Sequence, residues 1–195
     1  MTNKEKIERI FNEYESDIES DDYSNFAPEV LRWCGSIIMK EIEEEFGTFI
    51  SYYRDRYVII DDVVFSTDKK ELVRYSPEKT DESYVIPDYV KTIRDGAFQG
   101  SEHLSRVTIS KSIRRIGNRA FSDSPVLAEI VWDTPKASGG SYIFVNCPKL
   151  KTVITDDAQK LANYVYDNEG SPFVNGAQLI VNGEICDISI FEETK

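Results

Sequence analysis

Histidine and cysteine, the side chains that most often act as catalytic bases and nucleophiles, are scarce in this sequence. It has one histidine, His103, and three cysteines, Cys34, Cys147 and Cys186. A nucleophilic site needs a base close to its nucleophile, and a zinc site needs cysteines and histidines at short spacing. Neither pattern is present, so we expect no catalytic residue, no metal site and no cofactor. An odd number of widely spaced cysteines predicts free thiols instead of a disulfide framework.

Carboxylates and glycines could form two other kinds of functional site, a pair of catalytic acids and a phosphate-binding loop. The 35 aspartate and glutamate residues are enough for a paired-acid hydrolase, which stays a remote alternative because nothing in the sequence brings two of them together. The glycine patterns of phosphate and dinucleotide sites are absent, and Gly139-Gly140 predicts only a turn. The residues that could carry chemistry therefore favour binding over catalysis.

Charge is unevenly distributed along the chain, whose formal net charge is −12. Residues 1–48 hold 13 acidic and 5 basic residues, a balance of −8, whereas residues 86–120 hold 3 acidic and 7 basic residues, a balance of +4. The overall sign argues against direct binding to the phosphates of nucleic acid. We expect two charged surfaces that could contact a protein partner: an acidic cluster that includes Asp17, Asp21 and Asp22, and a basic patch formed by Lys91, Lys111, Arg114, Arg115 and Arg119. The alternatives are that both are solvated faces that keep the protein soluble, or that they pair with each other within the chain.

The elements that must position these side chains begin with an acidic helical region, residues 1–47. Thr2 and Glu5 form a capping-box pattern, and apolar residues then recur at helical spacing along one face. Pro28 suits the first turn of a second helix, and Gly47 suits its end. We expect a helical hairpin here. Its wide apolar stripe favours packing on the rest of the chain, with a partner-binding helix as the alternative.

From residue 48 to residue 83 the apolar pattern changes to a period of two, which is typical of strands. Short strands are expected at Phe49–Tyr53, Tyr57–Ile60, Val63–Phe65 and Leu72–Tyr75, with turns at Asp61-Asp62 and Thr67–Lys70. We interpret residues 48–83 as a β-hairpin or capping segment.

Residues 84–155 carry an internal repeat of 23 residues. Four columns keep this step: Phe98, Phe121 and Phe144; Leu104, Leu127 and Leu150; Val107, Ile130 and Val153; Ile86, Ile109 and Trp132. A fixed period of this length indicates one supersecondary unit stacked on copies of itself. We expect a solenoid with one short parallel strand per repeat and the three phenylalanines superposed in its core. Trp132–Ser141 is expected to break the third unit, and residues 156–195 are interpreted as a degenerate repeat and C-terminal cap.

Strand alternation turns one residue of each repeat outward, in the row Val85, Thr108, Val131 and Ile154. At about 4.8 Å per strand this row spans roughly 15 Å, which is short for a standard interface of about 800 Å² per partner. We expect either that other segments extend the row or that the N-terminal helices cover it. We favour contact of this row with a protein partner.

The repeat resembles the BspA-type leucine-rich repeat, whose pattern runs roughly I-P-x-x-V-x-x-I-x-x-x-A-F-x-x-C-x-x-L-x-x-V-x-I. The first copy here reads IPDYVKTIRDGAFQGSEHLSRVTI, from Ile86 to Ile109, and the second reads ISKSIRRIGNRAFSDSPVLAEIVW, from Ile109 to Trp132. The third keeps FVNCPKLKTV, with Cys147 at the position of the family's usual cysteine. The likeness covers about residues 57–190. It implies protein–protein or surface-adhesion roles and no catalysis.

Two classes of function stay open. The one we favour is a non-enzymatic protein–protein interaction module that presents the leucine-rich-repeat surface, on an α+β chain in which a helical hairpin precedes a short solenoid. The alternative is an acidic intracellular inhibitor of the phage or plasmid anti-defence type, such as an anti-CRISPR, that blocks a nucleic-acid-binding enzyme. The sequence has neither an apolar run long enough to span a membrane nor an apolar signal core. We therefore expect a cytoplasmic location, or a secreted one if a signal peptide has been removed.

Overall fold

The structure, a computed structural model, describes residues 56–134, 137–161, 173 and 176–187. The expected helical hairpin of residues 1–47 and the expected strand Phe49–Tyr53 lie outside the described residues. The same holds for the acidic cluster residues Asp17, Asp21 and Asp22.

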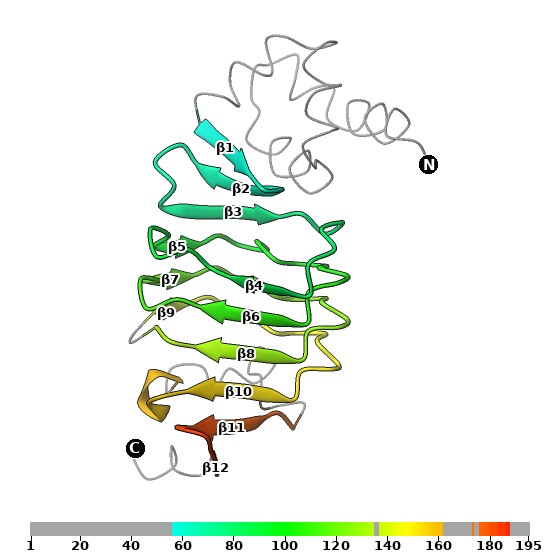
Figure 1. Cartoon of the computed structure of the whole chain (residues 1–195), viewed down its shortest axis with the longest axis vertical. Coiled ribbons are helices and arrows are strands. Elements are labelled where there is room, and N and C mark those ends of the chain that lie inside the picture. The colour runs from blue at the N-terminus through cyan, green and yellow to red at the C-terminus, as the bar shows by residue number, and fades with distance from the viewer. Residues whose placement is uncertain (1–55, 135–136, 162–172, 174–175, 188–195) are drawn as a thin grey trace.

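The described residues wind into a β-solenoid with a sheet on each of two sides (Figure 1). Sheet A contains, in spatial order, β1 (Tyr57–Ile60), β2 (Val63–Ser66), β3 (Glu71–Tyr75), β5 (Thr92–Ile93), β7 (Arg115–Ile116) and β9 (Ser138–Gly139). Sheet B contains β12 (Glu184–Cys186), β11 (Gln178–Val181), β10 (Thr152–Thr155), β8 (Glu129–Trp132), β6 (Arg106–Ile109) and β4 (Ser83–Val85). A short 3-10 helix, η1 (Ala158–Leu161), follows β10. The repeat units pass through a strand of each sheet, so a unit contributes two strands where the sequence predicted one.

Residues that are 23 positions apart pair with each other on neighbouring parallel strands, as the repeat length predicted from the sequence requires. In sheet B, Val107 pairs with Ile130, which pairs with Val153. In sheet A, Arg115 pairs with Ser138, which places β9 one full step after β7. The prediction that Trp132–Ser141 breaks the third unit is therefore wrong. This segment differs in composition but keeps the repeat length, so sheet A extends into it through β9 and sheet B continues beyond it in β10.

A column of stacked aromatic rings runs through the core. Phe98, Phe121 and Phe144 are buried, with ring centroids 4.8 Å apart in the first pair and 5.4 Å apart in the second. The predicted superposition of the three phenylalanines is therefore confirmed. Tyr75 of β3 stacks on Phe98 at 5.2 Å and continues the column into the capping segment. Because each ring is covered by rings of adjacent turns, an isolated turn could not bury its own phenylalanine.

The strands β1, β2 and β3, residues 57–75, pair antiparallel at one end of sheet A and form the cap of the solenoid. The turn between β1 and β2 is Asp61-Asp62, as predicted, and both residues have positive φ, 51° and 56°, as in the primed turns that suit hairpins. β3 then pairs in parallel with β5, so the cap continues directly into the solenoid. The buried Arg74 joins the two, because its guanidinium donates to the carbonyl oxygens of Gly96 and Gln99.

Two glycines one repeat apart let successive turns approach closely. A β-carbon at Gly117 would lie 2.5 Å from the carbonyl carbon of Arg94, and a β-carbon at Gly140 would lie 2.5 Å from the carbonyl carbon of Gly117. Contacts this short are not tolerated between packed atoms. The sequence predicted only a turn at Gly140 and did not reveal this glycine column, because the first repeat has Arg94 in the corresponding position.

Candidate protein-binding surface

The row of outward residues predicted for the repeats is present on sheet B. Val85 pairs with Thr108, Thr108 with Val131, and Val131 with Ile154. Their neighbours along each strand, such as Val107, are fully buried, as strand alternation requires. Val85 is 65% exposed, and the other three outward residues are partly exposed.

Two further strands lengthen this row. Ile154 pairs with Ile180 of β11, which in turn pairs with Ile185 of β12. Ile185 is 69% exposed. We call Val85, Thr108, Val131, Ile154, Ile180 and Ile185 the outward row. It crosses six strands and, at about 4.8 Å per strand, is roughly 24 Å long.

An extension of the row by other segments was one of the two expectations from the sequence, but the residues that provide it, Ile180 and Ile185, were not predicted. Ile180 follows Ile154 by 26 residues, which departs from the 23-residue step. The pairing of β12 with β11 is antiparallel, so Ile185 lies outside any repeat register. Only the folded sheet therefore aligns these two isoleucines with the predicted four.

A polar column lies beside the outward row on the same face of sheet B. It consists of Ser83, Arg106, Glu129, Thr152 and Gln178, which pair in register from β4 to β11. Arg106 and Glu129 form an ion pair at 2.8 Å. An exposed pair of this kind contributes under about 1 kcal/mol to stability. The face thus combines an apolar strip with a hydrogen-bonding border, as the core and rim of protein interfaces do.

The basic residues predicted to form a patch lie at the strands of sheet A, away from the outward row. The backbone N–H of Arg114 donates to the carbonyl oxygen of Lys91 at 2.7 Å, so these residues occupy one column, as predicted. Both side chains turn back and donate to carbonyl oxygens of their own loops, at 3.1 Å for Lys91 and 3.0 Å for Arg114. Arg115 belongs to β7. The candidate residues therefore fall on two surfaces and not on one.

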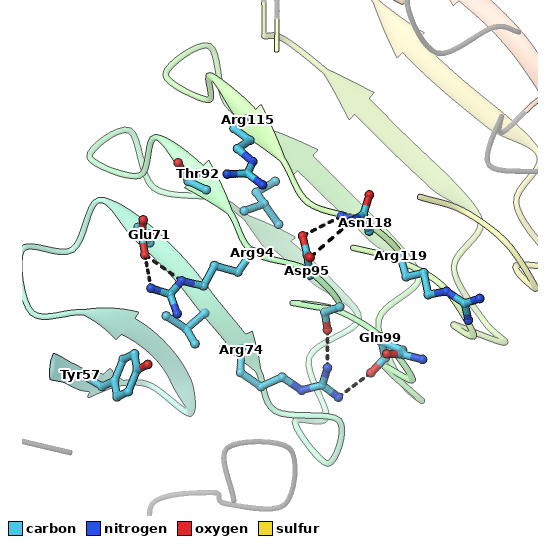
Figure 2. Close-up of a pocket in the computed structure, with 13 residues that line it drawn as sticks. Tyr57, Glu71, Arg74, Thr92, Arg94, Asp95, Gln99, Arg115, Asn118 and Arg119 are labelled. Atoms are coloured by element: carbon cyan, nitrogen blue, oxygen red, sulfur yellow. Dashed lines mark hydrogen bonds and ion pairs between the residues drawn. The ribbon is translucent and has the colours of Figure 1, made fainter. Parts of the chain in front are cut away.

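An open groove of about 720 Å³ lies over β3, β5 and β7 of sheet A (Figure 2). Its charged lining residues are Glu71, Arg74, Arg94, Asp95, Arg115 and Arg119. Arg94 Nε donates to Glu71 Oε2 at 2.7 Å, and the Arg94 guanidinium lies 5.9 Å from the centroid of the Tyr57 ring. Of these residues only Arg115 and Arg119 belong to the basic patch predicted from the sequence, because the groove combines the cap with repeat columns that become neighbours only on folding.

Cys147 and His103, two residues whose side chains could take part in catalysis, lie among the described residues. The thiol of Cys147 is buried, and burial raises its pKa to about 11, so it stays protonated at neutral pH and is a poor nucleophile. His103 is exposed, in the loop before Leu104. Across the described ranges, no three His, Cys, Asp or Glu side chains are grouped so that they could hold a metal ion. The expected absence of an enzymatic activity stays a prediction.

Within the part of the chain that the structure describes, no helix has the length and apolar character needed to cross a bilayer.

The comparisons with known proteins concern the repeat region. Residues 78–173 match the family model described as BspA type leucine rich repeat region, in six copies. No curated protein matches the chain. Neither result offers support for the inhibitor or the hydrolase alternative.

Several solved structures are similar to this chain. The pneumococcal vaccine antigen PcpA is 24% identical, with a TM-score of 0.43, over 52% of this chain and 31% of that one. A leucine-rich repeat protein from Eubacterium ventriosum is 22% identical, with a TM-score of 0.41, over 54% of this chain and 35% of that one. A leucine-rich repeat protein from Bacteroides capillosus is 17% identical, with a TM-score of 0.46, over 66% of this chain and 99% of that one. The chain thus covers about a third of the length of the first two.

Proposed function

We propose that this chain, whose residues 78–173 belong to the BspA type leucine-rich repeat family, is a protein-binding module that contacts its partner through the outward face of sheet B. The observation that carries the proposal is the outward row. Five of its six residues are valine or isoleucine, they are aligned across six strands, and the two at its ends are 65% and 69% exposed. An aligned, mostly apolar strip on a surface marks an interaction site more often than scattered apolar residues do.

The geometry of the strip indicates the kind of contact. The sheet is rigid, because its parallel strands are fixed in register and their inward residues share one core. A partner that lies across the strands could therefore bury the strip without a rearrangement of the solenoid. The strip alone is too narrow for a standard interface of about 800 Å² per partner. The contact should extend onto the polar column, where Arg106 and Gln178 offer exposed hydrogen-bonding groups.

Site-specific photo-crosslinking in host cells can identify the partner. A benzophenone amino acid would replace Val85, Val131 or Ile185 of the outward row. As a control it would replace Lys111, an exposed residue in the loop between β6 and β7. We expect the three row positions to yield an adduct with the same protein and the Lys111 position to yield none. Adducts formed equally well from Lys111 would show that the row has no special role.

The energetic test uses the purified partner. Val131→Lys places a charge in the centre of the row, and Ser138→Lys places the same charge on an exposed position of sheet A. We expect Val131→Lys to weaken binding by more than tenfold with little change in Tm, because desolvating an unpaired ammonium in an apolar contact is costly. Wild-type affinity of a stable Val131→Lys protein would refute the proposed surface.

A further inference from the structure

The groove on sheet A is a concave surface, distinct from the outward row of sheet B. Its walls come from three parts of the chain: Tyr57 and Glu71 from the cap, Thr92 and Arg94 from the first repeat, and Arg115 from the second (Figure 2). Thr92 and Arg115 are direct neighbours in the parallel register of β5 and β7. The groove is therefore a product of the rigid solenoid and does not depend on a single loop.

The groove is a cationic region in an acidic protein. Its lining contains four arginines against Glu71 and Asp95, a balance of +2, whereas the whole chain carries −12. Charge of one sign in a concave surface focuses the local field and raises the local concentration of oppositely charged groups. The groove thus attracts anionic groups that the rest of the chain repels.

Two of the arginines are committed to the fold. The guanidinium of Arg74 is buried and donates to the carbonyl oxygens of Gly96 and Gln99. Arg94 is paired with Glu71. Substitution of either residue would therefore disturb the cap as well as the groove, so neither gives a clean test of binding.

The other two arginines, Arg115 and Arg119, have guanidinium N–H groups that can bind a ligand. Arg115 is exposed and makes no side-chain hydrogen bond or ion pair with the residues that the structure describes. Arg119 is also exposed, and its guanidinium lies 5.7 Å from the ring centroid of Tyr142, a contact that leaves its N–H groups available. A guanidinium in this state can receive a carboxylate through two parallel hydrogen bonds.

We propose that this groove binds an acidic, extended peptide segment of a protein partner, with Arg115 and Arg119 each receiving a carboxylate. Arg115 and Arg119 are four residues apart in the same turn of the solenoid, so their Cα atoms are at most about 14 Å apart. Side chains on one face of an extended peptide recur about every 6.8 Å. Two carboxylates two or four residues apart on one face of such a peptide are about 7 or 14 Å apart, which lies within this limit, so each guanidinium can receive its own carboxylate.

Binding of fluorescein-labelled hexaglutamate to the full chain, followed by fluorescence anisotropy at low salt, tests this site. Arg115→Gln and Arg119→Gln remove the two receiving charges, and Lys111→Gln removes an exposed charge that is not part of the lining. We expect each arginine variant to bind about tenfold more weakly, as for the loss of a charge-assisted hydrogen bond, and Lys111→Gln to bind within twofold of the wild type. Binding should also weaken as salt rises to physiological strength, because the screening length falls to about 8 Å.

Three outcomes would overturn the assignment. Equal losses in all three variants would show only general attraction between charges. Displacement of the peptide by inorganic phosphate, at an ionic strength where chloride has no effect, would assign the site to a small oxyanion. A gain of affinity in the Asp17→Asn, Asp21→Asn, Asp22→Asn triple variant, not shared by the equally charged control Glu43→Gln, Glu44→Gln, Glu45→Gln, would identify this chain's own acidic residues as the occupant. Each outcome is independent of the test at Val131, so the two surfaces can fail separately.

Discussion

Cys147 lies with its Sγ 3.0 Å from the carbonyl oxygen of Phe121, one turn earlier in the solenoid. Ser124 stands in the same column of the preceding repeat, and its Oγ donates to the carbonyl oxygen of Phe98 at 3.1 Å. In both cases the donor follows the acceptor by 26 residues. A thiol and a hydroxyl therefore perform the same structural task, which is to satisfy a buried carbonyl beside the aromatic column.

This equivalence predicts the effect of two substitutions at Cys147. Cys147→Ser should cost little stability, because the hydroxyl can donate to the same carbonyl oxygen. Cys147→Ala should cost about 1–2 kcal/mol, because it removes the donor and leaves a small void. Chemical denaturation monitored by tyrosine and tryptophan fluorescence would give both values. Equal losses in the two variants would show that the hydrogen bond does not matter.

The aromatic column predicts a large effect at its centre. Phe121 stacks between Phe98 and Phe144 and is fully buried, so Phe121→Ala should lower the free energy of unfolding by about 3–5 kcal/mol. Phe121→Leu, which keeps most of the volume, should cost less. Denaturant titration of both variants would check this order. A loss below about 1 kcal/mol in Phe121→Ala would contradict the packing described above.

The close approach of turns at Gly117 predicts that even one added methyl group is harmful. Gly117→Ala should destabilise the fold by about 1–3 kcal/mol or more, because its β-carbon would overlap the backbone of Arg94 and Asp95. Ser138→Ala, at an exposed position of β9, serves as the control and should change Tm very little. Thermal unfolding followed by circular dichroism would compare them. A Gly117→Ala protein as stable as the control would mean that the turns are more loosely stacked.

Asp123 predicts a pH-dependent contribution to stability. Hydrogen bonds from the side chain of Asn146, supported by those from Gln99 and Ser122, hold the pKa of Asp123 below its ordinary value of 3.8. A carboxyl whose pKa is lowered on folding stabilises the fold fully above its unfolded pKa, and this contribution is lost as the pH falls through the folded pKa. Asp123→Asn should therefore be less stable than the wild type at pH 7, and the difference should shrink below pH 3.8. Urea titrations at a series of pH values would measure it, and a difference independent of pH would rule out the charge as its source.

The sequence by itself determined the repeat architecture. A solenoid turn can bury its core residues only against its neighbours, so the same residue types must return at the same step. The 23-residue step was visible in Phe98, Phe121 and Phe144, and strands of both sheets pair with the same step. The outward orientation of Val85 and Val131 followed as well, because strand alternation fixes which side chains leave the core. The helical hairpin of residues 1–47 stays a prediction, since it lies outside the described residues.

Only the tertiary structure decided what lies beside the repeat columns. Ile180 and Ile185 join the outward row through a 26-residue connection and an antiparallel hairpin, neither of which leaves a periodic signal. The groove on sheet A requires Glu71 of the cap to face Arg94 and Arg115 of two different repeats. Such neighbours are set by how the cap and the turns stack, and stacking depends on pairing and close approach between segments far apart in the sequence. Periodicity reports which face of a strand is buried, but it does not report which other segment lies alongside it.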